Sequence, residues 1–276
     1  MKVIILVGGF GTRIESVAKG RAKTLLPIYV DGKYQPIFYF LLDKINRANK
    51  VINDIDEAVV ITNDKYYIQM ISACDQYKLN NIDNSIPIRV ISDHSTCNEN
   101  RLGANGDLQF ANDRLGETDD VLILAGDNYF DFELSDFIKF YQQKKEIDAN
   151  PTVIAAKQFE EEKKEYVHKS FAIVELDKTG KVTEMVEKPA LIGKEMNSNL
   201  GAIALYVMTR KNFNLIDEYL KSCADNPKGR DAMGHFAGYL SKNTATYSFT
   251  FDGEFIDIGT VEEYNKLQKP DVELKV

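Results

Sequence analysis

Two cationic side chains follow a glycine-rich loop near the start of the chain. The loop has the sequence GGFG at residues 8–11, Thr12 and Arg13 come directly after it, and Lys23 follows ten residues later. Backbone N–H groups that a glycine loop turns outward bind phosphate oxygens. An arginine adds paired, charge-assisted hydrogen bonds, and a lysine adds a point charge. We therefore interpret this segment as a site for a polyphosphate.

The glycines alone leave other interpretations open. A dinucleotide-binding fingerprint needs G-x-G-x-x-G, but Gly9 and Gly11 are followed by Ile14 where the third glycine belongs. A Walker loop would end in Gly-Lys-Ser/Thr, which is missing. The simplest alternative is a turn between a strand and a helix that needs a positive φ. The polar residues after the loop, above all Arg13 and Lys23, favour the phosphate site.

Four further segments extend this pattern along the chain. They are RLGANGD at residues 101–107, LILAGDNYF at 122–130, VEKP at 186–189 and FIDIGTVEEY at 255–264. Together with the N-terminal GGFGTRI and KTLLPI, they resemble, in the same order, the signature motifs of the sugar-1-phosphate nucleotidyltransferases. The resemblance runs from residue 5 to residue 264 and so covers nearly the whole chain.

The resemblance implies an enzyme that converts a nucleoside triphosphate and a sugar 1-phosphate into a nucleotide sugar and pyrophosphate. Our preferred substrates are dTTP or UTP and glucose 1-phosphate. The nucleophile is a phosphate oxygen, and with a second pKa near ~6 it is already ionised at neutral pH, so no general base is needed. Catalysis of this kind depends on positioning and on electrostatic stabilisation of the departing pyrophosphate.

The resemblance also implies roles in binding the nucleotide. Arg13 would hold the β- and γ-phosphates and stabilise the leaving pyrophosphate, and Lys23 would lie near the α-phosphate. The backbone of the RLGANGD segment would read the base. The expected nucleotide-binding residues are Gly8, Gly9, Gly11, Thr12, Arg13, Lys23, Leu102 and Gly103.

The remaining motifs would bind the sugar phosphate and a metal ion. Lys188 would clamp the phosphate of the sugar 1-phosphate, and Glu187 would accept hydrogen bonds from the sugar hydroxyls. Asp127 and Asp257 would bind a Mg²⁺ ion that bridges oxygens of the α-phosphate. Mg²⁺ prefers one or two carboxylates together with substrate phosphates and water, which suits two isolated aspartates. The expected catalytic residues are Arg13, Lys23, Asp127 and Lys188.

Several positions depart from the usual family pattern. Ala104 and Asp107 stand where Thr and Ala are common in the base-reading segment. Ala204 stands where a glycine commonly lets the sugar approach the backbone. These differences leave the phosphate chemistry intact, but they leave the identity of the base and of the sugar open.

Three other classes of protein share part of this pattern. A cytidylyl- or guanylyltransferase acting on another phosphorylated acceptor would share the glycine loop and Asp127, but would not need E-K-P and D-x-G-T in this order. A glycosyltransferase would need a D-x-D metal motif, whereas Asp127 is followed by Asn128 and Tyr129. A non-catalytic regulatory subunit that binds nucleotide sugars would be expected to lack Arg13, Lys23 or Asp127.

Composition and charge limit the classes of binding partner and indicate where in the cell the protein acts. The 276 residues carry a net charge of −8, which argues against a nucleic acid or an anionic membrane as the main partner. Cys74, Cys97 and Cys223 are odd in number and far apart, so neither a disulfide framework nor a zinc site is expected. No signal peptide or membrane span is visible, and we expect a cytoplasmic protein. By analogy with the family we expect a homo-oligomer.

These residues need a scaffold, and the hydrophobic pattern predicts one. Strands that alternate with helices indicate a parallel sheet covered on both faces. We therefore predict an α/β, Rossmann-like fold with a mixed, mainly parallel central sheet flanked by helices. The expected buried strands are residues 2–7, 57–62, 86–91 and 121–127, and the expected helices between the first three are residues 36–48 and 64–79.

The alternation fades after about Pro151, where short strands follow one another with turn-like connections. Thr179-Gly180 is a hairpin signal between two of them. We predict a single domain over residues 1–276, with a nucleotide-binding half at 1–150 and an inserted sugar-phosphate-binding half at 151–265. The expected elements of the second half are strands at residues 152–157, 171–176, 181–187 and 202–208, helices at 209–222 and 231–241, and a last helix that begins at the capping box TVEE, residues 260–263.

Overall fold

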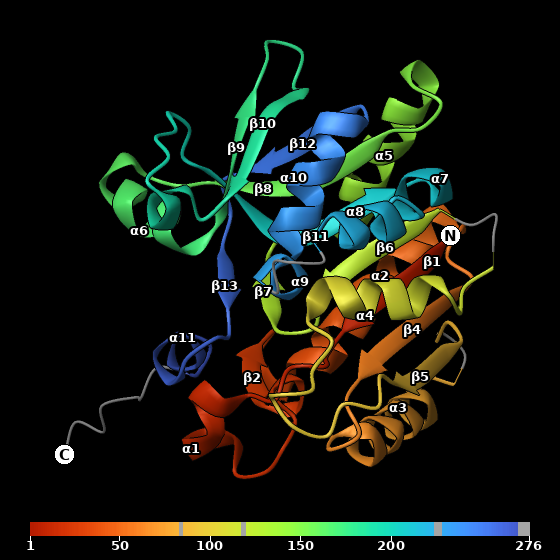
Figure 1. The fold of residues 1–276 in the computed structure, drawn as a ribbon. Coiled ribbons are helices and arrows are strands. Elements are labelled where there is room, and N and C mark those ends of the chain that lie inside the picture. Colours follow the sequence, from red (N-terminus) through yellow and green to blue (C-terminus); the bar gives the residue numbers. More distant parts are fainter. Residues whose placement is uncertain (83–84, 117–119, 224–227, 270–276) are drawn as a thin grey trace.

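A nine-stranded mixed sheet forms the centre of the protein (Figure 1). The structure is a computed structural model, and it describes residues 1–82, 85–116, 120–223 and 228–269. The predicted α/β class, with a central sheet flanked by helices, is confirmed. In spatial order the strands are β10 (Val182–Glu187), β9 (Ala172–Leu176), β11 (Leu200–Met208), β6 (Val121–Ala125), β1 (Lys2–Leu6), β4 (Glu57–Thr62) and β5 (Ile88–Ser92), with β8 (Thr152–Gln158) paired to β11 and β12 (Thr246–Phe251) paired to β8.

Four parallel strands form the N-terminal part of the sheet. β1 pairs with β4 on one side and with β6 on the other, so that Ile4 lies between Val59 and Ile123. These strands are nearly continuous apolar runs because both faces of the sheet are covered. Val3 and Ile5 pack into one hydrophobic core and Ile4 into another. The first core is covered by α2 (Ile37–Ile52) and α3 (Tyr67–Asn80), and the second by α4 (Ala104–Asn112).

The second half of the chain continues the sheet with antiparallel strands. β11 runs antiparallel to β6, β8 and β9. β9 and β10 form the predicted hairpin, and Gly180 in its turn has φ 80. β12 returns in parallel to β8. Two longer helices complete the layers, α5 (Leu134–Ile147), which packs against α2, and α10 (Met233–Asn243), which packs against β10.

Two small sheets lie outside the central one. β2 (Pro27–Val30) pairs with β3 (Lys33–Pro36), and β7 (Asn128–Phe130) pairs with β13 (Phe255–Asp257). Within the described ranges, no helix combines the length and the apolar character needed to cross a membrane. The remaining helices are α1 (Glu15–Ala18), α6 (Lys164–Ser170), α7 (Arg210–Phe213), α8 (Ile216–Ser222), α9 (Lys228–Asp231) and α11 (Val261–Lys266).

The single helix predicted at residues 209–222 is wrong, because the structure divides it into α7 and α8. The side chain of Asn212 in α7 donates hydrogen bonds to the Asn150 carbonyl and the Thr152 hydroxyl, which fasten this short helix to the start of β8. α8 instead packs its apolar face into the core. The predicted start of the last helix is confirmed: Thr260 is the N-cap of α11, and its hydroxyl accepts a hydrogen bond from the Glu263 N–H. The Glu263 carboxylate accepts from Lys266.

Candidate active site

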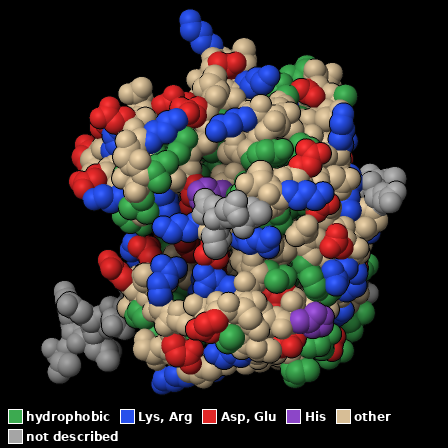
Figure 2. Space-filling view, viewed as in Figure 1, with side chains coloured by type: hydrophobic (Ala, Val, Ile, Leu, Met, Phe, Trp, Pro, Cys, Tyr) green, Lys and Arg blue, Asp and Glu red, His purple; other side chains and the backbone are tan. Residues whose placement is uncertain are grey.

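A cleft of about 550 Å³ opens at the carboxyl ends of β1 and β6, where open α/β sheets bind their ligands. This main cleft is lined by the glycine loop (residues 8–11), Asp127 and Lys188, among others. A second cavity, of about 220 Å³, is lined by Glu187 and Asp257, and it shares Asp127 with the main cleft. Figure 2 shows Lys and Arg side chains, with Asp and Glu side chains beside them, near the middle of the face drawn.

The glycine loop is held through a carbonyl group, and among the described residues several of its N–H groups have no protein acceptor. The side-chain amide of Asn63 donates a hydrogen bond to the Gly8 carbonyl at 2.8 Å. Gly11 has φ 65, in the left-handed region that glycine adopts without steric cost. In the part of the chain that the structure describes, the backbone N–H groups of residues 9–13 donate to no protein acceptor. Such a row of N–H groups can bind an anion.

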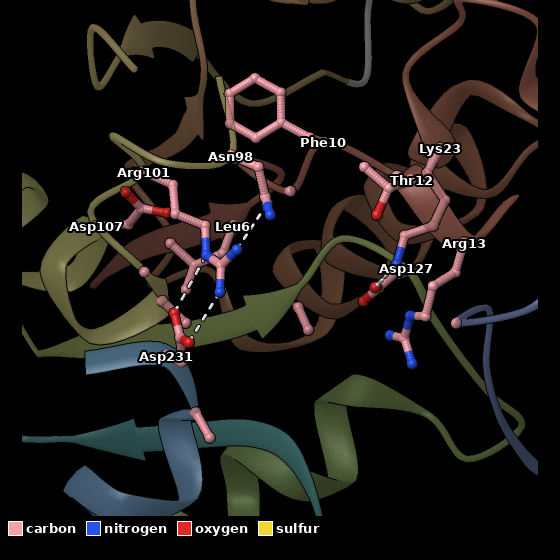
Figure 3. Close-up of a pocket in the computed structure, with 18 of the residues that line it drawn as sticks. Leu6, Phe10, Thr12, Arg13, Lys23, Asn98, Arg101, Asp107, Asp127 and Asp231 are labelled. Carbon is pink, nitrogen blue, oxygen red and sulfur yellow. Dashed lines mark hydrogen bonds and ion pairs between the residues drawn. The ribbon is translucent and has the colours of Figure 1, made fainter. Parts of the chain in front are cut away.

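Lys23 and Arg13 place positive charge beside Asp127 (Figure 3). The Lys23 ammonium group forms an ion pair with Oδ2 of Asp127. Burial lowers the pKa of Lys23, but the attraction of Asp127 and Asp257 outweighs burial, and the pKa lies above its ordinary value. The Arg13 guanidinium lies near Gly259, where a Cβ would come within 3.4 Å of its Nη2. Two positive side chains therefore reach the same end of the main cleft.

Asp127 and Asp257 come together through the pairing of β7 with β13. Asp257 is opposite Asn128, and the Ile258 N–H donates to the Asp127 carbonyl at 3.0 Å. Burial and the negative charge of Asp127 raise the pKa of Asp257 to about 6, against the effect of the two neighbouring cations. Two carboxylates that repel each other favour a cation between them. Among the described residues they are not part of any group of three His, Cys, Asp or Glu side chains that could hold a metal ion.

Glu187 and Lys188 follow one another at the end of β10 but line different cavities. Glu187 lines the second cavity and Lys188 lines the main cleft, with 3.4 Å between Lys188 Nζ and Glu187 Oε1. Lys188 has φ 45 and ψ 59, a left-handed conformation that costs a non-glycine residue roughly 1–2 kcal/mol. Strain of this kind clusters at functional sites. Glu187 fits because Gly234 of α10 has no side chain, and a Cβ there would lie 1.9 Å from Glu187 Oε2.

Of the two residues of the RLGANGD segment that were expected to bind the nucleotide, only Gly103 lines the main cleft. Gly103 lines the cleft and has φ 77 as the N-cap of α4, and a Cβ on it would lie 2.6 Å from the Arg230 carbonyl oxygen. Leu102 lines neither the main cleft nor the second cavity, and its side chain lies against Gly106. The structure therefore does not bring the Leu102 side chain to the site.

Most of the residues singled out from the sequence meet at one place. Residues from both halves of the chain contribute to it, and the two cavities adjoin at Asp127. The second cavity is lined by Glu187 and Asp257. The main cleft is lined by Gly8, Gly9, Gly11, Thr12, Arg13, Lys23, Gly103, Asp127 and Lys188.

Sequence reasoning missed two features of the main cleft. Arg101 forms a two-point ion pair with Asp231 of α9, at 3.2 and 2.8 Å, and also donates to the Asn98 side chain at 2.6 Å (Figure 3). Asp107 lines the same cleft and is almost fully buried. The sequence marks Asp107 only as a departure from the family pattern. Nothing in the local sequence connects Arg101 with Asp231.

The sequence profile of the nucleotidyl transferase family matches residues 2–273. The chain belongs to this family. The glucose-1-phosphate adenylyltransferase of Thermotoga maritima is 27% identical over 272 residues, covering 95% of this chain and 58% of that protein. A candidate mannose-1-phosphate guanyltransferase of Sulfolobus acidocaldarius is 25% identical over 267 residues, covering 97% of this chain and 62% of that protein. The chain thus spans about three fifths of the length of these curated relatives.

Solved structures share the fold of this chain. A UDP-glucose pyrophosphorylase in complex with UDP-glucose superposes with a TM-score of 0.74 over 96% of each chain, at 18% identity. The UTP-bound UGPase of Acinetobacter baumannii gives a TM-score of 0.70 over 96% of this chain and 91% of that chain, at 16% identity. The predicted resemblance is therefore confirmed for the family and for the architecture.

Proposed function

We propose that this chain transfers a nucleotidyl group from a nucleoside triphosphate to a sugar 1-phosphate and releases pyrophosphate. One observation carries the proposal: Arg13, Lys23, Asp127, Asp257 and Lys188 all line two adjoining cavities. Three cationic side chains and two carboxylates at one site suit a reaction in which two anionic substrates must approach each other. Positioning and electrostatic stabilisation supply most of the catalysis in such phosphoryl-type transfers.

In this proposal the triphosphate binds in the main cleft. The backbone N–H groups of residues 9–13, which donate to no acceptor among the described residues, hold phosphate oxygens together with the Thr12 hydroxyl. Arg13 holds the β- and γ-phosphates through its planar guanidinium group, and Lys23 reduces the negative charge at the α-phosphate. When the α–β bond breaks, Arg13 stabilises the charge that develops on the departing pyrophosphate. The backbone at Gly103 contacts the base.

The sugar 1-phosphate binds in the second cavity and reaches the main cleft beside Asp127. Glu187 accepts hydrogen bonds from sugar hydroxyls, and Lys188 holds the phosphate group. An oxygen of that phosphate, ionised because its second pKa is near ~6, attacks the α-phosphorus of the triphosphate. The new oxygen–phosphorus bond forms while the bond to the oxygen bridging the α- and β-phosphates breaks, and that electron pair leaves with pyrophosphate. No proton is transferred, so no general base is required.

Asp127 and Asp257 fit a divalent metal ion, and we propose that it is Mg²⁺. Asp127 directly precedes β7, which is paired with the strand of Asp257, and the repulsion between the two carboxylates contributes to the raised pKa of Asp257, after burial. Two carboxylates completed by phosphate oxygens and water form the ligand set that Mg²⁺ prefers. When bound, such an ion neutralises negative charge on the phosphate that is attacked.

We propose UTP or dTTP and glucose 1-phosphate as the substrates, and a cytoplasmic site of action. The likeness to a UDP-glucose pyrophosphorylase supports this choice. A guanylyltransferase is the second candidate, because a relative that covers 97% of this chain is a candidate mannose-1-phosphate guanyltransferase. With either pair of substrates, residues 1–150 would bind the nucleotide and residues 151–265 would bind the sugar phosphate. Asp257, from the second half, would also bind the metal ion.

Release of pyrophosphate tests the proposal. The purified protein is mixed with Mg²⁺, each of the five common nucleoside triphosphates, and glucose 1-phosphate, mannose 1-phosphate or N-acetylglucosamine 1-phosphate. We expect pyrophosphate only when both a triphosphate and a sugar phosphate are present. Asp127→Asn is the matched control, because it preserves the size of the side chain and removes its charge. The proposal would be refuted if the folded protein released no pyrophosphate in any combination, or if it released pyrophosphate without a sugar phosphate.

A further inference from the structure

A pair of buried acids lies beside the glycine loop and takes no part in the mechanism above. Asp107, in the first turn of α4, is 6% exposed, and Asp93, directly after β5, is 5% exposed. Two carboxyl groups packed together in this way do not both carry charge, because the repulsion between them is too strong. One of the two acids must therefore hold a proton at neutral pH.

The neighbouring hydrogen-bond donors show which acid is charged. Oδ1 of Asp93 accepts hydrogen bonds from the N–H and the hydroxyl of Ser95, both at 2.7 Å. Oδ1 of Asp107 is buried and has no hydrogen-bond partner among the described residues. Burial, followed by the charge of Asp93 and a hydrogen bond to it, raises the pKa of Asp107 to about 9. Asp107 is thus the neutral acid, and it donates to the Asp93 carboxylate.

Packing against Gly8 connects the acid pair to the glycine loop. A Cβ on Gly8 would lie 2.7 Å from Oδ2 of Asp107 and 3.5 Å from Oδ2 of Asp93. The pair therefore occupies the space that any side chain at Gly8 would need. The Gly8 carbonyl is held at the same time by Asn63. The position of the loop, and of the N–H groups that follow it, depends on these contacts.

Two basic residues next to the acid pair or just before α4 have other partners. Arg101, just before α4, pairs with Asp231, and His94, next to Asp93, faces Asp64 at 3.7 Å. Neither of these two side chains balances the acid pair. A second negative charge there would repel the first, and it would also repel an anion bound at the loop N–H groups. The loop therefore needs a neutral group at this place.

We propose that Asp107 is a positioning residue for the nucleoside triphosphate. As a neutral acid held against Asp93, it supports the glycine loop and keeps a second negative charge away from the phosphates. The inference rests on the proposed function, because it takes the main cleft as the triphosphate site. Loss of the Asp107 proton weakens triphosphate binding and leaves the chemical step unchanged, since this side chain does not touch the reacting atoms.

Asp107→Asn and Asp113→Asn test the inference as a matched pair. Asparagine keeps the shape of Asp107 and can donate to Asp93, but it does not ionise, and Asp113 is exposed at the end of the same helix. Calorimetry measures the dissociation constant of each common nucleoside triphosphate with Mg²⁺, without sugar phosphate, at pH 7 and pH 9.5. The loss of affinity on raising the pH should be up to about four-fold larger for the wild type and Asp113→Asn than for Asp107→Asn, because a group with a pKa of about 9 is only partly ionised at the higher pH. Ionisation of the nucleobase of the triphosphate affects the binding to all three proteins equally, so it does not contribute to the difference between them.

Steady-state kinetics with both substrates separate positioning from catalysis. Between the same pH values, the wild-type KM for the triphosphate should rise up to about four-fold more than that of Asp107→Asn, while their kcat values change in parallel. Asp107→Ala, which cannot donate to Asp93, should show a raised KM already at pH 7.

Three outcomes would overturn the inference. They are an equal pH dependence of the wild type and Asp107→Asn, a wild-type affinity that does not change with pH, and a change confined to kcat. A wild type that binds no triphosphate at pH 7 would instead defeat the proposed function, and the inference with it.

Discussion

The ammonium group of Lys23 is paired with Oδ2 of Asp127, across 104 residues of the chain. Asp257 lies on the strand next to Asp127 and also attracts Lys23. Lys23 therefore supplies a positive charge to the two carboxylates proposed to bind a metal ion. A divalent ion must compete with Lys23 for Asp127, and triphosphate oxygens that attract Lys23 would remove this competition. We expect the metal ion and the triphosphate to favour each other's binding.

Lys23→Met should bind a divalent ion more tightly than the wild type when no nucleotide is present. The substitution frees Asp127 and removes a like charge from the vicinity of the ion, so a gain of about ten-fold, or ~1.4 kcal/mol, is expected. Mn²⁺ takes the place of Mg²⁺ in the measurement, because electron paramagnetic resonance quantifies free Mn²⁺ directly. This readout does not depend on enzymatic activity.

Lys188→Met is the matched control for Lys23→Met. Lys188 lines the same cleft, but its ammonium group lies beside Glu187. Its loss should leave Mn²⁺ affinity close to that of the wild type. Equal affinities of Lys23→Met and the wild type would show that Lys23 does not compete with the ion.

Asp127→Asn and Arg13→Ala should each lower kcat strongly while the fold survives. Each removes a charge that is proposed to act on the reacting phosphates, and the loss of one such contact costs about a hundred-fold in rate or more. Pyrophosphate release at saturating substrates measures kcat, and circular dichroism checks the fold. Arg21→Ala, which changes an exposed arginine outside the main cleft, should behave like the wild type. A rate near that of the wild type would exclude the substituted residue from the mechanism.

Much of the fold can be predicted from the sequence because the parallel strands have strong local patterns. The strand predicted at residues 57–62 has the bounds of β4, since its apolar run is buried within the sheet. The glycine loop, Arg13 and Lys23 lie within sixteen residues of one another, so their proximity in space follows from a short segment. This part of the site is therefore visible without the structure.

The rest of the site depends on contacts that local patterns do not encode. β7 and β13 have three residues each, too few for a periodic signal, yet their pairing brings Asp257 to Asp127. α4 follows Gly103 and contains Gly106, and an interior glycine disfavours a helix. The helix forms because Leu108 is buried in the core, a contact with distant strands. The burial of Asp107 follows from that helix, and the sequence alone does not reveal it.

Asp107→Asn should change how stability depends on pH. The pKa of Asp107 is raised to about 9 in the folded protein, against an ordinary value near ~3.9. The folded state therefore holds this proton more tightly than the unfolded state. Its stabilising effect is complete below about pH 4 and is lost as the pH rises to about 9. Over that range, the free energy of unfolding of the wild type should fall relative to Asp107→Asn by up to about 1.4 kcal/mol per pH unit.

Urea unfolding between pH 6 and pH 8 measures this difference. The exposed Asp113 provides the control again, and Asp113→Asn should remain parallel to the wild type. A gap between the wild type and Asp107→Asn that stays constant with pH would mean that Asp107 is already ionised in the folded protein. It would also contradict the inference that a neutral Asp107 supports the glycine loop.

Gly234→Ala should weaken sugar-phosphate binding and spare the triphosphate. A Cβ on Gly234 would lie 1.9 Å from Oε2 of Glu187 and 2.8 Å from the Cβ of Ala172, so Glu187 must move. Hydrogen bonds to a charged group contribute about 1.5–3 kcal/mol, so the KM for the sugar 1-phosphate should rise about ten- to hundred-fold. Lys242→Ala, at an exposed position of the same helix, should change neither KM. If both KM values rise together in Gly234→Ala, the substitution disturbs the whole site, and Glu187 loses its assignment to the sugar.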